Sequence, residues 1–289
     1  MESQKKFQPT YSFEVFPPKT EQGAEKLRLV RDRLMQVNPL YISVTYGAGG
    51  TTRDRTIETV TEFQEAGVSA APHLSCIGST KEEILDLLEL YRSKGIDRIV
   101  ALRGDLPSGM GAGEAGDFRY ANELVEFIRT ETGDHFFLEV AAYPEFHPQA
   151  SSARADLDNF KRKVEAGANG AITQYFFNAD AYLSFVDSCE KMGLDIPILP
   201  GIMPITNFTQ LARFSDGCGT EIPRWLRSRL EGYGDDLESI HALGQDVISK
   251  MCQRLLDEGA PGLHFYTMNQ ANSVLGIWKK LGLPGAELL

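Results

Sequence analysis

Short runs rich in β-branched and aromatic residues alternate with amphipathic stretches along almost the whole chain, and this alternation is the strongest constraint on the fold. Most of the runs begin about 25 to 38 residues apart, the length of one strand–helix unit. Eight such units predict a (β/α)8 barrel. The expected strands are Tyr11–Phe16, Tyr41–Tyr46, Ala70–Leu74, Arg98–Leu102, Phe136–Ala142, Ala171–Phe176, Ile196–Leu199 and Leu263–Thr267.

Helical periodicity occupies the intervals between these runs. The expected helices are Glu21–Val37, Arg53–Glu65, Lys81–Lys94, Tyr120–Thr130, Ala153–Ala166, Ala179–Met192, Phe208–Phe214 and Ala271–Leu281. The interval before Leu263 is longer than the others and holds two further helical stretches, Pro223–Glu231 and Asp236–Glu258. We interpret them as an extra helical excursion on the barrel, and residues 1–289 as a single catalytic domain without a regulatory domain.

An open, doubly wound parallel sheet is the alternative to a barrel. The run Gly111–Gly116 matches the dinucleotide-binding fingerprint letter for letter, but it does not follow a predicted strand. The fingerprint has meaning only between a strand and a helix, so we interpret this run as a loop.

The net charge of −11 argues against a protein that binds nucleic acid or an anionic membrane, because either would need a basic surface. The four cysteines are Cys76, Cys189, Cys218 and Cys252, and no two of them form a Cys-x-x-Cys pair, so neither a zinc knuckle nor a dithiol redox motif is expected. No set of His, Asp and Glu residues has the spacing of metal ligands, so no metal site is expected. The polar N-terminus and the absence of about 18 consecutive apolar residues favour a cytoplasmic protein without a membrane span. A monomer and a homo-oligomer both remain open.

Active sites of (β/α)8 barrels lie at the carboxyl ends of the strands, and Glu14 is the most informative residue there. Strand alternation places Ser12, Glu14 and Phe16 on one face. A carboxyl group flanked by aromatic residues should be desolvated, with a raised pKa that suits a general acid. The alternative is a structural ion pair with a cation such as Arg103.

Arg103 and Asp105 share a face of the chain after the fourth strand. Gly104 between them permits close approach of the backbone to a flat ligand. A simple ion pair between Arg103 and Asp105 is the other interpretation.

Two sets of helical positions each have a binding and a structural interpretation. Asp156, Asn159 and Lys163 lie on one helix face, where they could hold the ribose and phosphates of a nucleotide or simply face solvent. Gln210 and Phe214 share a face near the rim, where the ring could stack on a planar ligand or pack in the core.

Taken together, the rim segments resemble bacterial-type methylenetetrahydrofolate reductases. The resemblance runs in order from Tyr11 to Leu283 and is carried by Phe13–Thr20, Val44–Ala48, Ala71–Leu74, Ala101–Pro107, Ala142–Glu145, Lys161–Val164, Ile172–Phe176 and His264–Thr267. It implies a barrel with non-covalent FAD, which NADH or NADPH reduces and which then passes a hydride to methylenetetrahydrofolate. The partners it implies are therefore folate and a nicotinamide nucleotide.

The resemblance also implies roles for individual residues. Glu14 matches the general acid that protonates folate N10, and Asp105 matches a carboxylate between flavin and pterin. Glu14, Asp105, Gln174, Gln210 and Phe214 match substrate-binding positions. The FAD-contacting positions are Thr45, Tyr46, Ala48, His73, Arg103, Gly104, Asp105, Tyr120, Ala121, Tyr143, His147, Ala150, Asp156, Asn159, Arg162 and Lys163.

The resemblance departs at Gln270, where the family pattern has an arginine that holds part of the folate. Glutamine supplies no charge, so the contact at this substrate-binding position should differ. Three other functions remain open. They are a flavin-dependent barrel enzyme, such as a relative of proline dehydrogenase, with a different small substrate; hydride transfer from the nicotinamide directly to folate without flavin; and binding of folate or nucleotide without turnover.

Overall fold

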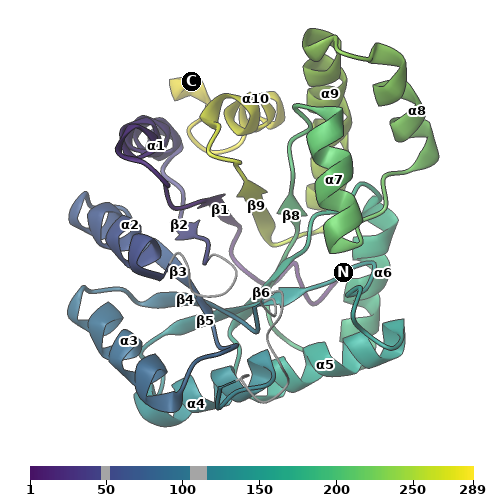
Figure 1. Cartoon of the computed structure of the whole chain (residues 1–289). Helices are drawn as coiled ribbons and strands as arrows, with labels where there is room; N and C mark the ends of the chain where they lie inside the picture. The colour runs from purple at the N-terminus through teal and green to yellow at the C-terminus, as the bar shows by residue number, and fades with distance from the viewer. Residues whose placement is uncertain (47–52, 105–115) are drawn as a thin grey trace.

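The computed structural model describes residues 1–46, 53–104 and 116–289, and its strands form one nearly closed parallel barrel inside a ring of helices (Figure 1). The sheet order is β7-β6-β5-β4-β3-β2-β1-β9-β8. Its strands are β1 (Thr10–Val15), β2 (Tyr41–Val44), β3 (Ala70–Ser75), β4 (Arg98–Leu102), β5 (Phe137–Ala142), β6 (Gly170–Thr173), β7 (Ile198–Leu199), β8 (Gly201–Ile202) and β9 (Gly262–Tyr266). The predicted (β/α)8 barrel is confirmed, and the doubly wound alternative is wrong.

Helices follow the strands in turn and cover the outside of the barrel (Figure 1). They are α1 (Glu21–Leu34), α2 (Arg53–Glu65), α3 (Lys81–Ser93), α4 (Ala121–Thr132), α5 (Ala153–Glu165), α6 (Ala179–Lys191), α7 (Phe208–Cys218), α8 (Arg224–Tyr233), α9 (Leu237–Glu258) and α10 (Ala271–Leu281). The predicted excursion before the last strand consists of α8 and α9. Within the described ranges, no helix is both long and apolar enough to cross a bilayer.

The seventh strand position of the barrel, here called the seventh stave, consists of the two short strands β7 and β8, which Pro200 separates. The sequence predicted one continuous strand, Ile196–Leu199, at this position. Proline has no N–H to donate to a ladder. Its carbonyl still accepts a hydrogen bond from the His264 amide at 3.0 Å. A Cβ on Gly201 would lie 2.1 Å from the Thr173 carbonyl oxygen, so the chain needs glycine to close the barrel here.

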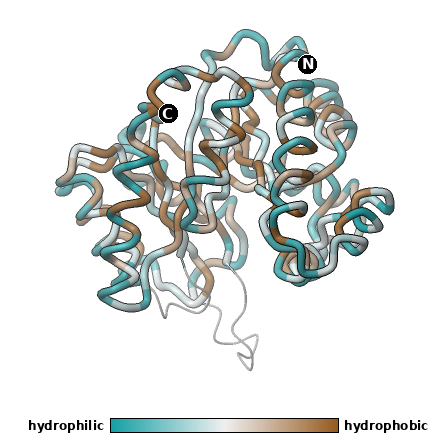
Figure 2. Tube along the Cα trace, turned by 90° about the horizontal axis from the view of Figure 1, so that it is seen from above, coloured by the Kyte–Doolittle hydropathy of each residue, from teal (hydrophilic) through white to brown (hydrophobic). Residues whose placement is uncertain are grey.

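Alternation along β1 separates an apolar outer layer from a polar interior. Phe13 points outward and packs on Trp278 of α10 with ring centroids 5.3 Å apart. Ser12 and Glu14 point the other way, into the barrel. Hydrophilic and hydrophobic residues also alternate along the helices, as expected for elements that bury one face (Figure 2).

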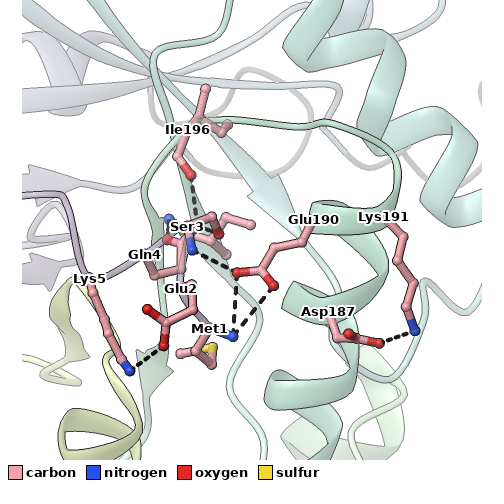
Figure 3. A network of polar contacts seen from close by, with 10 residues as sticks. Met1, Glu2, Ser3, Gln4, Lys5, Asp187, Glu190, Lys191 and Ile196 are labelled. Carbon is pink, nitrogen blue, oxygen red and sulfur yellow. Dashed lines mark hydrogen bonds and ion pairs between the residues drawn. The ribbon is translucent and has the colours of Figure 1, made fainter.

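The N-terminal segment lies beside α6 and the residues that lead into β7 (Figure 3). Gln4 is 1% exposed; its amide donates to the Ile196 carbonyl at 3.1 Å and accepts from the Ile198 amide at 2.8 Å. Glu190 of α6 accepts from the Ser3 amide at 2.8 Å. The Gln4 side chain therefore hydrogen-bonds the backbone groups of Ile196 and Ile198, which belong to the predicted strand Ile196–Leu199.

Candidate active site

The turn after β9 fixes the end of β1, where Glu14 lies. The Thr267 amide and hydroxyl both donate to the Glu14 carbonyl, at 3.1 and 2.6 Å. The Asn269 side chain accepts from the Phe16 amide at 2.8 Å and donates to the Phe16 carbonyl at 3.0 Å. Asn269 has a φ of 55°, a left-handed conformation that asparagine tolerates better than most residues. The backbone around Glu14 is thus held on one side by the last strand.

Two imidazoles flank the Glu14 carboxyl group. His73 Nε2, from β3, lies 3.2 Å from Glu14 Oε2, and His264 Nε2, from β9, lies 3.6 Å from the same oxygen. The Glu14 side chain is 11% exposed, and that of His264 is fully buried. Ser12 Oγ lies 2.7 Å from His264 Nδ1, so the far side of this ring is hydrogen-bonded.

The environment lowers the pKa of Glu14, opposite to the direction expected from the sequence. Burial raises this pKa, but the charge and hydrogen bonding of His73 and His264 outweigh burial and lower the pKa to about 2. The expectation of a raised pKa counted the aromatic neighbours and not the two imidazoles. The alternative pairing of Glu14 with Arg103 is also wrong, because the ion-pair contacts of Glu14 are with His73 and His264.

A cavity of about 460 Å³ opens between the carboxyl ends of β4 and β5 and helix α5. This volume is typical of small-molecule sites. Ten of its lining residues belong to the set expected to contact FAD: Arg103, Gly104, Tyr120, Ala121, Tyr143, His147, Ala150, Asp156, Asn159 and Lys163. The structure therefore gathers residues from β4, α4, β5 and α5 at one site, although they span 60 positions of sequence.

The cations of this cavity are held by neutral groups. Lys163 Nζ donates to the Ala141 carbonyl, and Arg103 donates to the side chain of Gln149. Burial lowers the pKa of Lys163 to about 8, a change that nearby Asp156 opposes. Among residues 1–46, 53–104 and 116–289, no carboxylate forms an ion pair with the Lys163 ammonium group. This environment suits an anionic ligand, because the ligand can supply the opposite charge.

The sequence is closely similar to curated enzymes of one kind. A family model described as methylenetetrahydrofolate reductase matches residues 1–282. A protein of Escherichia coli (strain K12) named 5,10-methylenetetrahydrofolate reductase is 45% identical over 276 residues, covering 95% of this chain and 91% of that protein. The chain belongs to the methylenetetrahydrofolate reductase family. Family members are oxidoreductases of folate one-carbon metabolism, as their name says.

Plant members of the methylenetetrahydrofolate reductase family are longer than this chain. "Methylenetetrahydrofolate reductase (NADH) 1" of Arabidopsis thaliana is 41% identical over 288 residues, which are 96% of this chain and 49% of the plant protein. Among solved structures, a Clostridium thermocellum protein superposes with a TM-score of 0.70 at 17% identity, covering 100% of this chain and 98% of that one. At this identity the likeness supports the barrel fold alone.

Within this family fold, the remaining expected FAD positions lie around the cavity or outside the described residues. Arg162 donates to Asn159 at 2.9 Å, beside the cavity. Thr45 and Tyr46 follow β2, and the Thr45 amide donates to the Val15 carbonyl at 3.0 Å, which places them next to the Glu14 strand rather than in the cavity lining. Burial raises the pKa of Tyr46. His73 contacts Glu14 directly. Ala48, Asp105 and residues 111–115 lie outside the described ranges.

The described residues that were expected to bind substrate lie on several different elements. Gln174 follows β6, and its side-chain oxygen accepts from the Tyr175 amide at 3.0 Å. Gln210 and Phe214 are half-buried on one face of α7. Gln270 is the N-cap residue of α10 and lines a separate cavity of about 290 Å³.

His264 is absent from the site residues expected from the sequence, although it touches Glu14. The register that pairs Ser12 with His264 and Glu14 with Tyr266 puts both β9 side chains inside the barrel. Alternation in Leu263–Thr267 already indicates that His264 and Tyr266 share a face, and this signal could have placed them beside Glu14.

Proposed function

We propose that this protein reduces 5,10-methylenetetrahydrofolate to 5-methyltetrahydrofolate, using a non-covalently bound FAD that NADH reduces. The names of its bacterial relatives support the folate reaction, and the plant relatives are named for NADH. The Clostridium thermocellum protein is described as binding two copies of 5-methyl-5,6,7,8-tetrahydrofolic acid, which supports folate as a ligand of this fold. The observation that carries the proposal is the single cavity lined by ten residues of the expected FAD set.

The residues of this cavity fit a dinucleotide cofactor. Lys163 and Arg103 supply positive charge, and within the part of the chain that the structure describes neither has a carboxylate at ion-pair distance, so both cations can bind a diphosphate. Asp156 accepts a hydrogen bond from the His147 amide at 3.0 Å, and its remaining lone pairs can accept from ribose hydroxyls. When bound, FAD supplies reversible hydride transfer, which no side chain of the protein can provide.

Glu14 is proposed to deliver the proton that opens the five-membered ring of the folate at N10. Its carboxyl oxygen is shared with two imidazoles, so a proton held in this cluster can lie on either nitrogen or on the carboxylate. The cluster lies at the carboxyl ends of the strands, where the cavity also opens. Asp105 is proposed to contact the pterin and flavin, as the family resemblance implies.

The substrate contacts are also a proposal. Gln174, Gln210 and Phe214 would contact folate or nicotinamide, and Gln270 would replace the charged contact of its relatives with a neutral amide. A neutral amide gives a weaker interaction with an anionic group than arginine does. We therefore expect salt to affect folate affinity less here than in relatives with arginine at this position.

The first test is the visible absorption spectrum of the purified protein, with mass analysis of any cofactor released. FAD and bleaching by NADH are expected. A colourless protein that cannot take up FAD would favour direct hydride transfer from nicotinamide or binding without turnover. FMN would contradict the assignment of the α5 face.

The second test separates the two half-reactions. Glu14→Gln removes the carboxylate but keeps the side-chain shape, so folate reduction should fall about 10²–10⁴-fold while flavin reduction by NADH continues. Glu145→Gln is the matched control, because Glu145 is a half-buried rim carboxyl that accepts from the Glu221 amide at 2.9 Å. Folate turnover unchanged in Glu14→Gln would refute the acid role.

A further inference from the structure

A line of polar side chains crosses the barrel interior beneath Glu14. It starts at Arg98, which donates to Glu139 at 2.6 Å. The Tyr41 hydroxyl donates to the same Glu139 oxygen at 3.4 Å. Burial raises the pKa of Tyr41, and the hydroxyl of Ser12 from the neighbouring strand β1 opposes this rise as a hydrogen-bond donor. Ser12 contacts His264 Nδ1 at 2.7 Å. These five residues come from five strands, and none of the lower three is assigned to the reaction above.

Glu139 is a hydrogen-bond acceptor that its neighbours hold in place. The Glu139 side chain is 3% exposed, and the Arg98 guanidinium that pairs with it lies 4.6 Å from the ring centroid of Tyr41 and 3.9 Å from that of Phe137. Gly170 makes room for this carboxylate, since a Cβ there would lie 2.6 Å from Glu139 Oε2. Burial raises the pKa of Glu139, whereas the charge of Arg98 at 2.6 Å favours the ionised form. An ionised carboxylate can only accept hydrogen bonds, so the Tyr41 hydroxyl is directed toward it.

The hydrogen bond from Tyr41 to Glu139 determines which atoms of Ser12 and His264 donate and which accept, because each hydroxyl group has only one proton. When Tyr41 donates to Glu139, its oxygen accepts from Ser12, and the Ser12 oxygen then accepts from His264 Nδ1–H. Burial lowers the pKa of His264, so the neutral ring has a lone pair on Nε2 in this arrangement. That lone pair faces Glu14 Oε2 at 3.6 Å and can accept from a protonated carboxyl group.

The reverse arrangement suits ionised Glu14. There Ser12 donates to His264 Nδ1, and His264 Nε2–H points at the Glu14 carboxylate. The hydrogen bonds from Ser12 through His264 to Glu14 can therefore be donated in either of two directions. Each direction matches one protonation state of Glu14. Only the first needs an acceptor below Ser12, and Tyr41 provides it.

We propose that Tyr41 is a positioning residue for Glu14: its hydroxyl, held by Glu139, allows Ser12 and His264 to present an acceptor nitrogen to Glu14, so that Glu14 can hold the proton it donates. This inference rests on the acid role of Glu14 in the proposed function. Tyr41 touches neither folate nor flavin in this scheme, and it acts through Ser12 and His264.

The sign of the pH effect follows from the groups around Glu14. Of the described residues, the titratable groups that act on this carboxyl group are His73 from β3 and His264 and Tyr266 from β9. Burial and the Glu14 charge raise the pKa of Tyr266, which therefore stays neutral. Without the Tyr41 hydroxyl, Ser12 donates to His264, Nε2–H faces Glu14, and the carboxylate form is favoured. The acid form is then lost at lower pH.

The first experiment measures the folate half-reaction of the reduced holoenzyme against pH in Tyr41→Phe. The phenyl ring keeps the packing on Arg98 and His264. The limb on which the rate falls as pH rises should move down by about one pH unit, a loss of about tenfold above the wild-type limb. Flavin reduction by NADH should not change. A limb that does not move would overturn the proposal.

The second experiment reads the tautomer directly and does not depend on folate turnover. Histidine ¹⁵N resonances distinguish Nδ1–H from Nε2–H, and His264→Gln assigns the signal among five histidines. As pH falls and Glu14 takes up a proton, His264 of the wild type should change from the Nε2–H to the Nδ1–H tautomer. In Tyr41→Phe and Ser12→Ala this change should need a lower pH, and Ser12→Ala serves if Tyr41→Phe does not fold. A tautomer change at the same pH in the wild type and the folded variants would refute the role of Tyr41.

The matched control is Tyr91→Phe. Tyr91 is a fully buried tyrosine of α3 whose hydroxyl has no hydrogen-bond partner among the described residues. It should leave both the pH limb and the His264 signal unchanged; equal shifts in Tyr91→Phe would mean that loss of any buried hydroxyl suffices and would contradict the proposal. A wild-type protein without folate reduction would refute the proposed function, while the tautomer experiment would still decide the inference about Tyr41.

Discussion

Replacement of Gln4 by alanine should destabilise the barrel although Gln4 is far from Glu14. The side chain is 1% exposed and satisfies the Ile196 carbonyl and the Ile198 amide (Figure 3). Alanine would leave both backbone groups buried without partners, at about 1–3 kcal/mol each. Allowing for partial relaxation, we expect the free energy of unfolding to fall by about 2–4 kcal/mol and the melting temperature by about 3–7 °C.

Equilibrium unfolding in urea measures this loss, with Gln8→Ala as the matched control. Gln8 belongs to the same N-terminal segment but is exposed, so its replacement should change the free energy by less than about 0.5 kcal/mol. The two variants should differ in midpoint and not in slope. A Gln4→Ala protein as stable as Gln8→Ala would refute the reasoning that this side chain completes the seventh stave.

Three further substitutions test other parts of the structure. Lys163→Met should weaken FAD binding about 10–100-fold in a fluorescence titration, and unchanged affinity would contradict the anion site. Because burial lowers the folded-state pKa of Lys163 to about 8, the unfolded chain binds more protons between pH 8 and 10.5; wild-type stability should rise with pH there relative to Lys163→Met, and parallel curves would oppose this. Gly201→Ala should lower stability by about 1–3 kcal/mol in thermal unfolding, since its Cβ would meet the Thr173 carbonyl at 2.1 Å; a neutral effect would mean that the stave can shift. Asn269→Ala removes two hydrogen bonds to Phe16 and should lower stability by about 1–3 kcal/mol in urea; no loss would show that the turn does not hold β1.

The barrel could be predicted from the sequence because its signals are local and repeated. Each unit carries a strand-length apolar run and an amphipathic helix, and β4 and α2 were predicted to the residue. The seventh stave could not be predicted in the same way. Its break at Pro200 and its completion by Gln4 depend on a contact across more than 190 positions, for which no local pattern exists.

In the candidate site, too, features set by neighbouring residues in the sequence could be predicted, and features set by contacts between distant residues could not. The face formed by Asp156, Asn159 and Lys163 is a helix spacing, and the structure places all three on one cavity. The pKa of Glu14 was expected in the wrong direction because the flanking sequence contains aromatic residues, whereas His73 and His264 arrive from other strands. Electrostatics inside a barrel depends on register between strands, which the order of residues alone does not provide.

The pairing of β1 with β9 has a consequence for biosynthesis. Ser12 and His264 are 252 residues apart, so at about 5–20 residues per second the first strand waits on the order of 10 s to a minute for its second neighbour. Until then β1 has one unpaired edge next to apolar side chains such as Phe13, and exposed edges promote aggregation. The imidazole of His264 reaches Glu14 only when β9 joins the sheet. A chain that stops short of β9 therefore lacks both barrel closure and the complete cluster of Glu14, His73 and His264. The pairing of β1 with β9 thus completes the barrel and the site in the same step.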